Sequence, residues 1–313
     1  MKFPQQTDGA MRTPATPLDA ATVILVRESA RGPYEVLLMR RHRKQDFMGG
    51  AYVFPGGRLE EADCDPALAA WAGGVEAAAW KRRLQESEIA EQAALGLFFA
   101  ALRETFEEAG VLLAYGSSGE ILDLRDGDTA GRFAGYRLQL MEGKLSLGEL
   151  ALRENLVYAL DLLCPYSHWI TPEIEPRRFD TRFFLARHPR GQLPIHDTIE
   201  MTRSAWMTPA AALGQSEAGN ILLMPPTLKT LDELSRFGTA DELFTHAGRK
   251  RIDVYLPEAF ACDDGYGIRL PYDPDYAIAR YKLPERSGEP SRILMKDGRW
   301  NMIVKVAGLL SGA

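Results

Sequence analysis

A short acidic stretch, residues 101–112, constrains this chain more than any other segment. It reads Ala-Leu-Arg-Glu-Thr-Phe-Glu-Glu-Ala-Gly-Val-Leu and places Glu104, Glu107 and Glu108 at positions i, i+3 and i+4. On a helix these carboxylates share one face, and Gly110 stands where a helix ends in a left-handed cap. Like charges this close repel one another unless a cation lies between them. The pattern therefore predicts a helix that binds a hard divalent cation, Mg²⁺ or Mn²⁺, through oxygen ligands.

Composition narrows the class of protein. The 313 residues are 46% hydrophobic, which supports a large folded core, and the formal net charge of −6 argues against a protein that coats nucleic acid. No apolar run reaches the roughly 18 residues that a membrane span needs. The three cysteines are far apart and odd in number. They favour reduced thiols, and hence a cytoplasmic protein, over a disulfide framework.

The order of predicted elements indicates the fold class. Apolar and β-branched runs predict strands, and Ala-, Glu- and Leu-rich stretches predict helices. We expect strands at 21–26, 34–39, 51–54, 179–186 and 198–206, and helices within 64–100 and at 93–109, 146–163, 209 onward and 226–237. Ser146 and Glu149 have the spacing of a capping box. This order predicts an α+β protein, an α/β/α sandwich with a mixed sheet. We expect a flexible lead at 1–17, one domain at 18–248 and a C-terminal extension of strands and loops at 249–313.

A glycine turn precedes the acidic helix in the sequence. Pro55-Gly56-Gly57 ends the strand predicted at 51–54. Two successive glycines let backbone amides approach a ligand closely, which suits phosphate oxygens.

With this turn and the acidic helix, the chain resembles the Nudix hydrolases. Their box is Gly, five residues, Glu, seven residues, then Arg-Glu-hydrophobic-x-Glu-Glu-x-Gly-hydrophobic. Gly57 matches the first half, and the second half is matched by Arg103, Glu104, Glu107, Glu108, Gly110 and Val111. Thr105 replaces a hydrophobic residue, and Asp63 stands where the family has Glu. Arg103 follows Gly57 by 46 residues where an unbroken box needs 14, so 32 residues are extra.

One branch of the family, the coenzyme A diphosphatases of the nucleoside diphosphate-linked moiety X motif 19 type, has an insertion in this place. The chain is similar to that branch over about residues 20–225, in blocks at 47–57, 103–113, 167–172 and 178–184. A signature of coenzyme A-cleaving Nudix enzymes is partly matched by Leu37, Leu38, Arg41, Gly50 and 54–57, whereas Met39, His42 and Asp46 depart from it.

The resemblance implies a Nudix fold with a helical insertion at 64–100 and a metal-dependent hydrolysis of a pyrophosphate bond. The substrate would be coenzyme A or acyl-coenzyme A, and the products adenosine 3′,5′-bisphosphate and (acyl-)4′-phosphopantetheine. The implied metal ligands are Glu104, Glu107, Glu108 and Asp63, with Arg103 orienting them and Glu104 or Glu200 as general base. The implied substrate-binding residues are Arg40, Arg41, Arg43, Phe54, Gly56 and Gly57, the arginines for the 3′-phosphate. A homodimer is a family-level expectation.

Two alternatives stay open. The substrate could be another nucleoside diphosphate derivative, such as ADP-ribose or NADH. Alternatively, the chain could be a Nudix-like ligand-binding regulator without turnover, although the three intact glutamates argue against this.

Some of these residues also have simpler explanations. An acidic helix face or a basic run is often only solvated, and His168 with Trp169 is typical of core packing.

Overall fold

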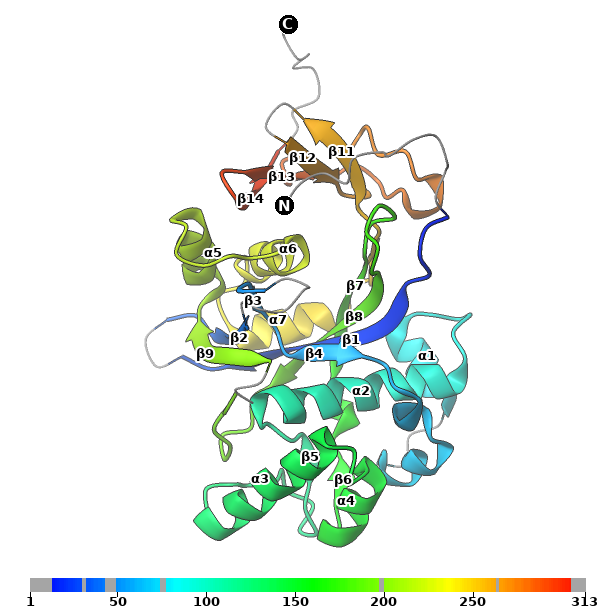
Figure 1. The fold of residues 1–313 in the computed structure, drawn as a ribbon, viewed down its shortest axis with the longest axis vertical. Helices are drawn as coiled ribbons and strands as arrows, with labels where there is room; N and C mark the ends of the chain where they lie inside the picture. Colours follow the sequence, from blue (N-terminus) through cyan, green and yellow to red (C-terminus); the bar gives the residue numbers. More distant parts are fainter. Residues whose placement is uncertain are drawn as a thin grey trace, which may run out of the picture.

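The structure is a computed structural model that describes residues 13–29, 32–42, 49–73, 77–196, 200–262 and 265–304. Among these residues, eight strands form one mixed sheet in the order β10-β7-β8-β1-β2-β3, with β4 paired to β1 and β9 to β2 (Figure 1). β1 and β8 are parallel, as are β10 and β7, and the other pairs are antiparallel. The strands are β1 Leu18–Arg27, β2 Glu35–Arg41, β3 Tyr52–Val53, β4 Gly56–Arg58, β7 Cys164–Ile170, β8 Phe179–Arg187, β9 Met201–Met207 and β10 Val254–Tyr255.

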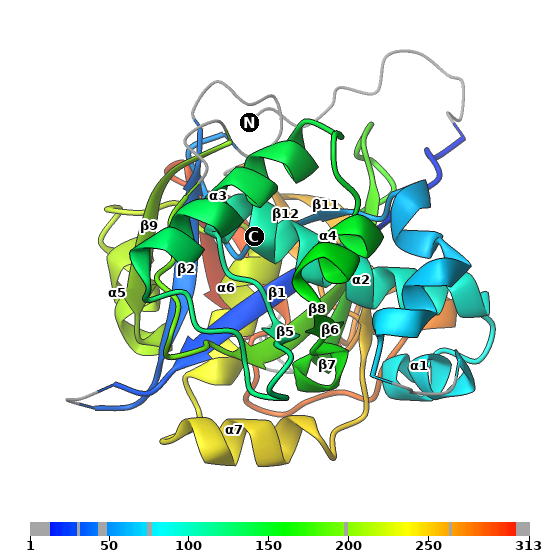
Figure 2. The ribbon, with the colours of Figure 1, turned by 90° about the horizontal axis from the view of Figure 1, so that it is seen from below.

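Helix α2 (Glu91–Ala109) packs on one face of this sheet. Strand alternation sends Val23 and Leu25 of β1 toward the α2 face, and Ile24 and Val26 toward the other face. Figure 2 is viewed from the outer side of this layer, where α3 and α4 lie. The other elements of this side are the helices α1 Ala77–Leu84, α3 Gly127–Met141 and α4 Leu147–Glu154, the strands β5 Ala114–Tyr115 and β6 Val157–Tyr158, and the 3-10 turns η1 Glu61–Cys64, η2 Pro66–Trp71 and η3 Leu160–Leu162.

The opposite face of the sheet is covered by three further helices and a second sheet (Figure 1). The helices are α5 Pro209–Glu217, α6 Pro225–Leu234 and α7 Ala240–Ala247, and the 3-10 turn η4 spans Ala279–Tyr281. The four antiparallel strands of the second sheet are β11 Glu258–Cys262, β12 Gly265–Arg269, β13 Arg292–Lys296 and β14 Arg299–Ile303. A mixed sheet with helices on both faces confirms the predicted fold class.

Local signals explain where several elements begin and end. Ser146 and Glu149 form the predicted capping box at the start of α4, and Thr208 caps α5 through the backbone N–H of Ala211. The helix expected over 146–163 is shorter, because Asn155 adopts a left-handed conformation (φ 50°) and the chain turns into β6. α2 begins at Glu91, so the last residues of the expected insertion belong to the acidic helix itself.

Residues after 249 add to both the sheet and the core. β10 pairs with β7, and the ring of Tyr255 stacks on Trp169 with centroids 4.6 Å apart. Tyr266, Ile268 and Trp300 of the second sheet are buried in the same core cluster as α6 and α7. The boundary expected near residue 248 stays a prediction.

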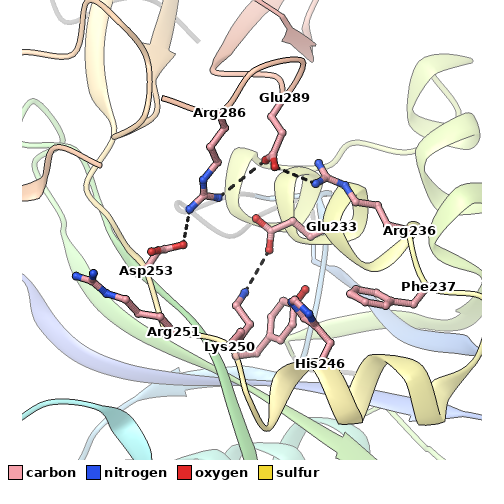
Figure 3. A pocket seen from close by; sticks show the side chains of 10 residues that line it. Glu233, Arg236, Phe237, His246, Lys250, Arg251, Asp253, Arg286 and Glu289 are labelled. Atoms are coloured by element: carbon pink, nitrogen blue, oxygen red, sulfur yellow. Dashed lines mark hydrogen bonds and ion pairs between the residues drawn. The ribbon is translucent and has the colours of Figure 1, made fainter. Parts of the chain in front are cut away.

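A hollow of about 380 Å³ lies between α6, the end of α7 and the loops around Asp253 and Glu289 (Figure 3). Most of its charged groups are paired with one another. Lys250 lies 3.7 Å from Glu233, and Arg236 lies 3.3 Å from Glu289. Because these pairs join α6 to the C-terminal segment, we interpret the hollow as an ion-pair network of the fold and assign it no ligand.

In the part of the chain that the structure describes, no helix is both long and apolar enough to span a bilayer.

Candidate active site

The acidic helix α2 has the form that its sequence predicts. Phe98, Leu102 and Phe106 are buried against the sheet, with exposed fractions of 1% or less. The helix ends at Gly110, which is left-handed (φ 69°) and donates its N–H to the carbonyl of Phe106 at 2.9 Å. This end places the three glutamates in the last two turns of a long, rigid element.

The segment predicted as a glycine turn lies directly against these glutamates, but its two glycines begin strand β4, which pairs with β1. The N–H of Gly56 donates to Oε2 of Glu108 at 2.8 Å. A Cβ atom on Gly57 would lie 2.2 Å from Oε1 of Glu104, so only glycine allows this approach. The two halves of the split box are therefore in contact, as the resemblance implies. The amide of Gly56, expected to face a phosphate, here binds a carboxylate of the protein.

Arg103 holds the acidic groups around it. Its Nε and Nη2 donate to the two oxygens of Asp63, both at 2.8 Å, and Nη2 also donates to the carbonyl of Arg58 at 3.0 Å. Its Nη1 donates to Glu104 at 2.9 Å and to Glu107 at 3.2 Å. Burial lowers the pKa of Arg103, but Asp63 and the glutamates outweigh it and raise the pKa. These contacts agree with the expected orienting role.

Asp63 engages Arg103, and none of its hydrogen bonds points to the glutamates. Only 2% of the residue is exposed, and its Oδ2 also accepts from the N–H of Glu60 at 2.9 Å. Both carboxylate oxygens thus have partners within the protein. The predicted metal contact of Asp63 stays a prediction, and the geometry favours a role as the anchor of Arg103.

Burial disfavours the charged forms of the three glutamates and raises the pKa of each. It raises the pKa of Glu104 to about 7, with Arg103 opposing and Glu107 adding to the shift. Burial also raises the pKa of Glu107, and it raises the pKa of Glu108 well above the usual range, with the charge of Glu104 adding to it. A divalent cation would relieve this repulsion.

The oxygens available in the acidic cluster suit such a cation. Each glutamate has one oxygen in a hydrogen bond, and its other oxygen has no hydrogen-bond partner among the described residues. Hard carboxylate oxygens of this kind fit Mg²⁺ or Mn²⁺. Within the described ranges, no three His, Cys, Asp or Glu side chains converge in an arrangement that could hold a metal ion. The ligand set therefore stays a prediction.

Glu200 and Arg41 lie beside the cluster. Nη2 of Arg41 is 3.7 Å from Oε2 of Glu200, whose side chain is 53% exposed. Arg41 lowers and Glu200 raises the pKa of Glu108, although burial is the largest cause of its shift. The structure thus brings Glu200, far away in sequence, to the acidic helix.

The other residues expected to bind substrate are dispersed. Along β2, Arg41 follows the side of Leu37 and Met39, whereas alternation places Arg40 on the opposite side. Phe54 is 3% exposed and packs in the core of the α6 face. Arg43 lies outside the described residues. Of the two arginines of this run that the structure describes, Arg41 is the one whose charge lowers the pKa of Glu108 in the acidic cluster.

His168 belongs to a buried polar cluster. Its Nε2 contacts Oδ1 of Asp180, and Arg182 donates to both oxygens of Glu86 at 2.7 and 3.0 Å. Glu86 follows α1, so the cluster ties the insertion to β7 and β8. Core packing was expected here, and His168 is 5% exposed; its contact with Asp180 explains one of the charged residues of the block at 178–184.

Our reading of the sequence missed one contributor to this region. Arg137 of α3 donates to backbone carbonyls at the end of α2. No element was predicted for this segment. Asp126, which caps α3 through the N–H of Thr129, was the available signal for a helix start.

Comparisons with known proteins agree with this geometry. The family described as the NUDT19 Nudix domain matches residues 16–236. Acyl-coenzyme A diphosphatase NUDT19 of Xenopus laevis is 24% identical over 322 residues, covering 88% of this chain and 81% of that protein. The Gallus gallus protein of the same name is 28% identical over 330 residues, covering 90% and 86%. A crystal structure of a Nudix hydrolase from Alicyclobacillus acidocaldarius has a TM-score of 0.55 and 26% identity, and the match covers 75% of this chain and 97% of that one. Because the family match spans most of the chain and includes the acidic helix and the glycine turn against it, the chain belongs to the Nudix hydrolases, in the family of the NUDT19 Nudix domain.

Proposed function

We propose that the protein hydrolyses the pyrophosphate bond of coenzyme A or acyl-coenzyme A. The products are adenosine 3′,5′-bisphosphate and 4′-phosphopantetheine or its acyl form. The observation that carries the proposal is the contact of Gly56 and Gly57 with Glu108 and Glu104. It joins the two halves of a box that 32 extra residues separate in the sequence.

We assign different roles in the hydrolysis to the described residues. A divalent cation, Mg²⁺ or Mn²⁺, held by Glu104, Glu107 and Glu108 would offset the charge of the diphosphate and lower the pKa of a bound water molecule. Arg103 fixes the directions of Glu104 and Glu107 through its Nη1. Asp63 fixes Arg103 in turn.

Glu200 is the stronger candidate for general base. Its side chain is half exposed, so water can reach it, whereas the side chain of Glu104 is buried and bound to Arg103. A base must be within reach of the water that it deprotonates. Arg41 then keeps Glu200 beside the cluster and adds positive charge for an anionic substrate.

The substrate class rests on the relatives, which are named acyl-coenzyme A diphosphatases. The positive charge of Arg41, which lowers the pKa of Glu108, supports an anionic ligand but does not select coenzyme A. A cytoplasmic location, suggested by three free thiols, and a homodimer belong to the proposal as expectations.

The test offers the purified chain four substrates: coenzyme A, an acyl-coenzyme A, ADP-ribose and NADH. Each is incubated with Mg²⁺, with Mn²⁺ or with EDTA, and products are identified by chromatography and mass spectrometry. We expect metal-dependent release of adenosine 3′,5′-bisphosphate from the first two. Glu107→Gln should reduce turnover by about 100-fold or more, since changes even to groups behind metal ligands can cost that much.

Glu91→Gln is the matched control, because Glu91 lies on the same helix and is exposed at its far end. It should keep wild-type turnover. If ADP-ribose or NADH is cleaved faster than coenzyme A, that compound and not coenzyme A is the substrate. Thermal stabilisation by these ligands without turnover would point to a binding protein instead.

A further inference from the structure

The last four backbone carbonyls of a helix have no partner within the helix. In α2 these belong to Phe106, Glu107, Glu108 and Ala109. Phe106 receives the N–H of Gly110 at 2.9 Å, and Ala109 receives the N–H of Ile195 at 2.8 Å. The two that remain are the carbonyls of the glutamates expected to bind metal.

One side chain donates hydrogen bonds to both of these carbonyls. Arg137 donates through Nε and Nη2 to the carbonyl of Glu107, at 2.9 and 2.7 Å, and through Nη2 to the carbonyl of Glu108 at 2.9 Å. A Cβ atom on Gly110 would lie 3.1 Å from Nη1 of Arg137, so the guanidinium also closely approaches the helix cap. Its positive charge lies where the helix dipole is negative.

α3 holds Arg137 in this place independently of α2. Phe133 of α3 is 1% exposed, and Arg132 pairs with Glu154 of α4 at 2.7 Å. The hydroxyl of Tyr136 donates to the same Glu154 at 2.9 Å. The guanidinium of Arg137 therefore reaches α2 from a helix that is fixed by other contacts.

We propose that Arg137 is a positioning residue for the metal site. By holding the backbone of Glu107 and Glu108, it fixes the last turn of α2 and hence the direction of both carboxylates. Glu108 is further held by Gly56 and Glu107 by Arg103, so each ligand is fixed at its backbone and at its side chain. Outer contacts of this kind tune metal affinity. This inference rests on the proposed function only in taking the glutamates as metal ligands.

The experiment measures Mn²⁺ binding directly, by isothermal titration calorimetry and by electron paramagnetic resonance of free Mn²⁺, in the absence of substrate. Arg137→Ala should weaken binding by about 10- to 100-fold. The metal concentration for half-maximal coenzyme A hydrolysis should rise by the same factor, with little change in KM at saturating metal. Arg137→Lys, which keeps the charge but not the forked donor geometry, should recover part of the loss.

Arg132→Ala is the matched control: it removes an arginine of the same helix that does not touch α2, its ion pair is half exposed and worth little, and Phe133 and Tyr136 still hold α3. It should leave Mn²⁺ affinity unchanged. The proposal fails if Arg137→Ala binds Mn²⁺ like the wild type, or if Arg132→Ala loses as much affinity. Should Arg137→Ala not fold, Arg137→Lys and Arg137→Gln decide the matter by the same titration. If Mn²⁺ binding depends on Arg137 but coenzyme A is not cleaved, the substrate proposal fails and this one stands.

Discussion

Replacing Arg103 by Met tests how the split box is held together. The side chain of Arg103 is 10% exposed and that of Asp63 only 1%. Two charge-assisted hydrogen bonds of 2.8 Å join them, and the substitution removes both. Since it leaves the Asp63 carboxylate buried without a cation, we expect the free energy of unfolding to fall by about 3–5 kcal/mol. Glu104 adds less to this loss, because its raised pKa of about 7 lets it take up a proton.

The assay is urea denaturation at neutral pH with EDTA, followed by circular dichroism. Asp63→Asn and the double variant complete a thermodynamic cycle. The double variant should be more stable than the sum of the single losses predicts, by about 1–3 kcal/mol. Arg58→Met is the control: its ion pair with Glu60 spans 3.6 Å and is largely exposed, so it should cost less than about 1 kcal/mol. An Arg103→Met loss no larger than that of Arg58→Met would refute the reasoning.

Three further outcomes are expected. Gly57→Ala should lower turnover by about tenfold or more, because its Cβ displaces the carboxylate of Glu104, whereas Gly116→Ala, with no atom within 4 Å, should not change steady-state rates. Without metal, the folded-state pKa of Glu104 is raised from 4.5 to about 7, so its contribution to stability is present below pH 4.5 and is lost as pH rises through 7. Because Gln stays neutral, the Tm of Glu104→Gln in EDTA should rise relative to that of the wild type over that range, and a constant difference would contradict the pKa shift. Trp80→Ala should cost about 3–5 kcal/mol in chemical denaturation, since Trp80 is 1% exposed and packs 4.8 Å from Phe98; a loss below 1 kcal/mol would mean that the insertion is not part of the core.

Features set by neighbours in sequence were predictable. The face shared by Glu104, Glu107 and Glu108, the left-handed cap at Gly110 and the capping box of α4 each depend on a few adjacent residues. The hairpin of β1 and β2 also follows from local patterns, with Val26 opposite Val36.

Features that depend on distant segments were not. Arg40 and Arg41 read as one basic run, but the two-residue period of a strand separates them onto opposite faces. Asp63 stands at a position that binds metal in the motif, but in the structure its partner is Arg103, which lies 40 residues away in the sequence. Arg137 has no motif at all, because its role arises only when α3 packs beside α2.

The contact between Asp63 and Arg103 also bears on how the insertion can vary. The chain leaves the active region at Asp63 and returns to it at Arg103, so the residues between them form a closed loop. By loop-closure entropy, lengthening this connection from the 8 residues of an unbroken box (14 − 6) to 40 (103 − 63) costs only on the order of 1 kcal/mol. That is less than the loss of about 3–5 kcal/mol expected when Arg103 is removed and Asp63 stays buried without a cation. Evolution or engineering can therefore lengthen or shorten the intervening stretch without moving Gly57 away from Glu104, provided that both ends of the loop stay joined.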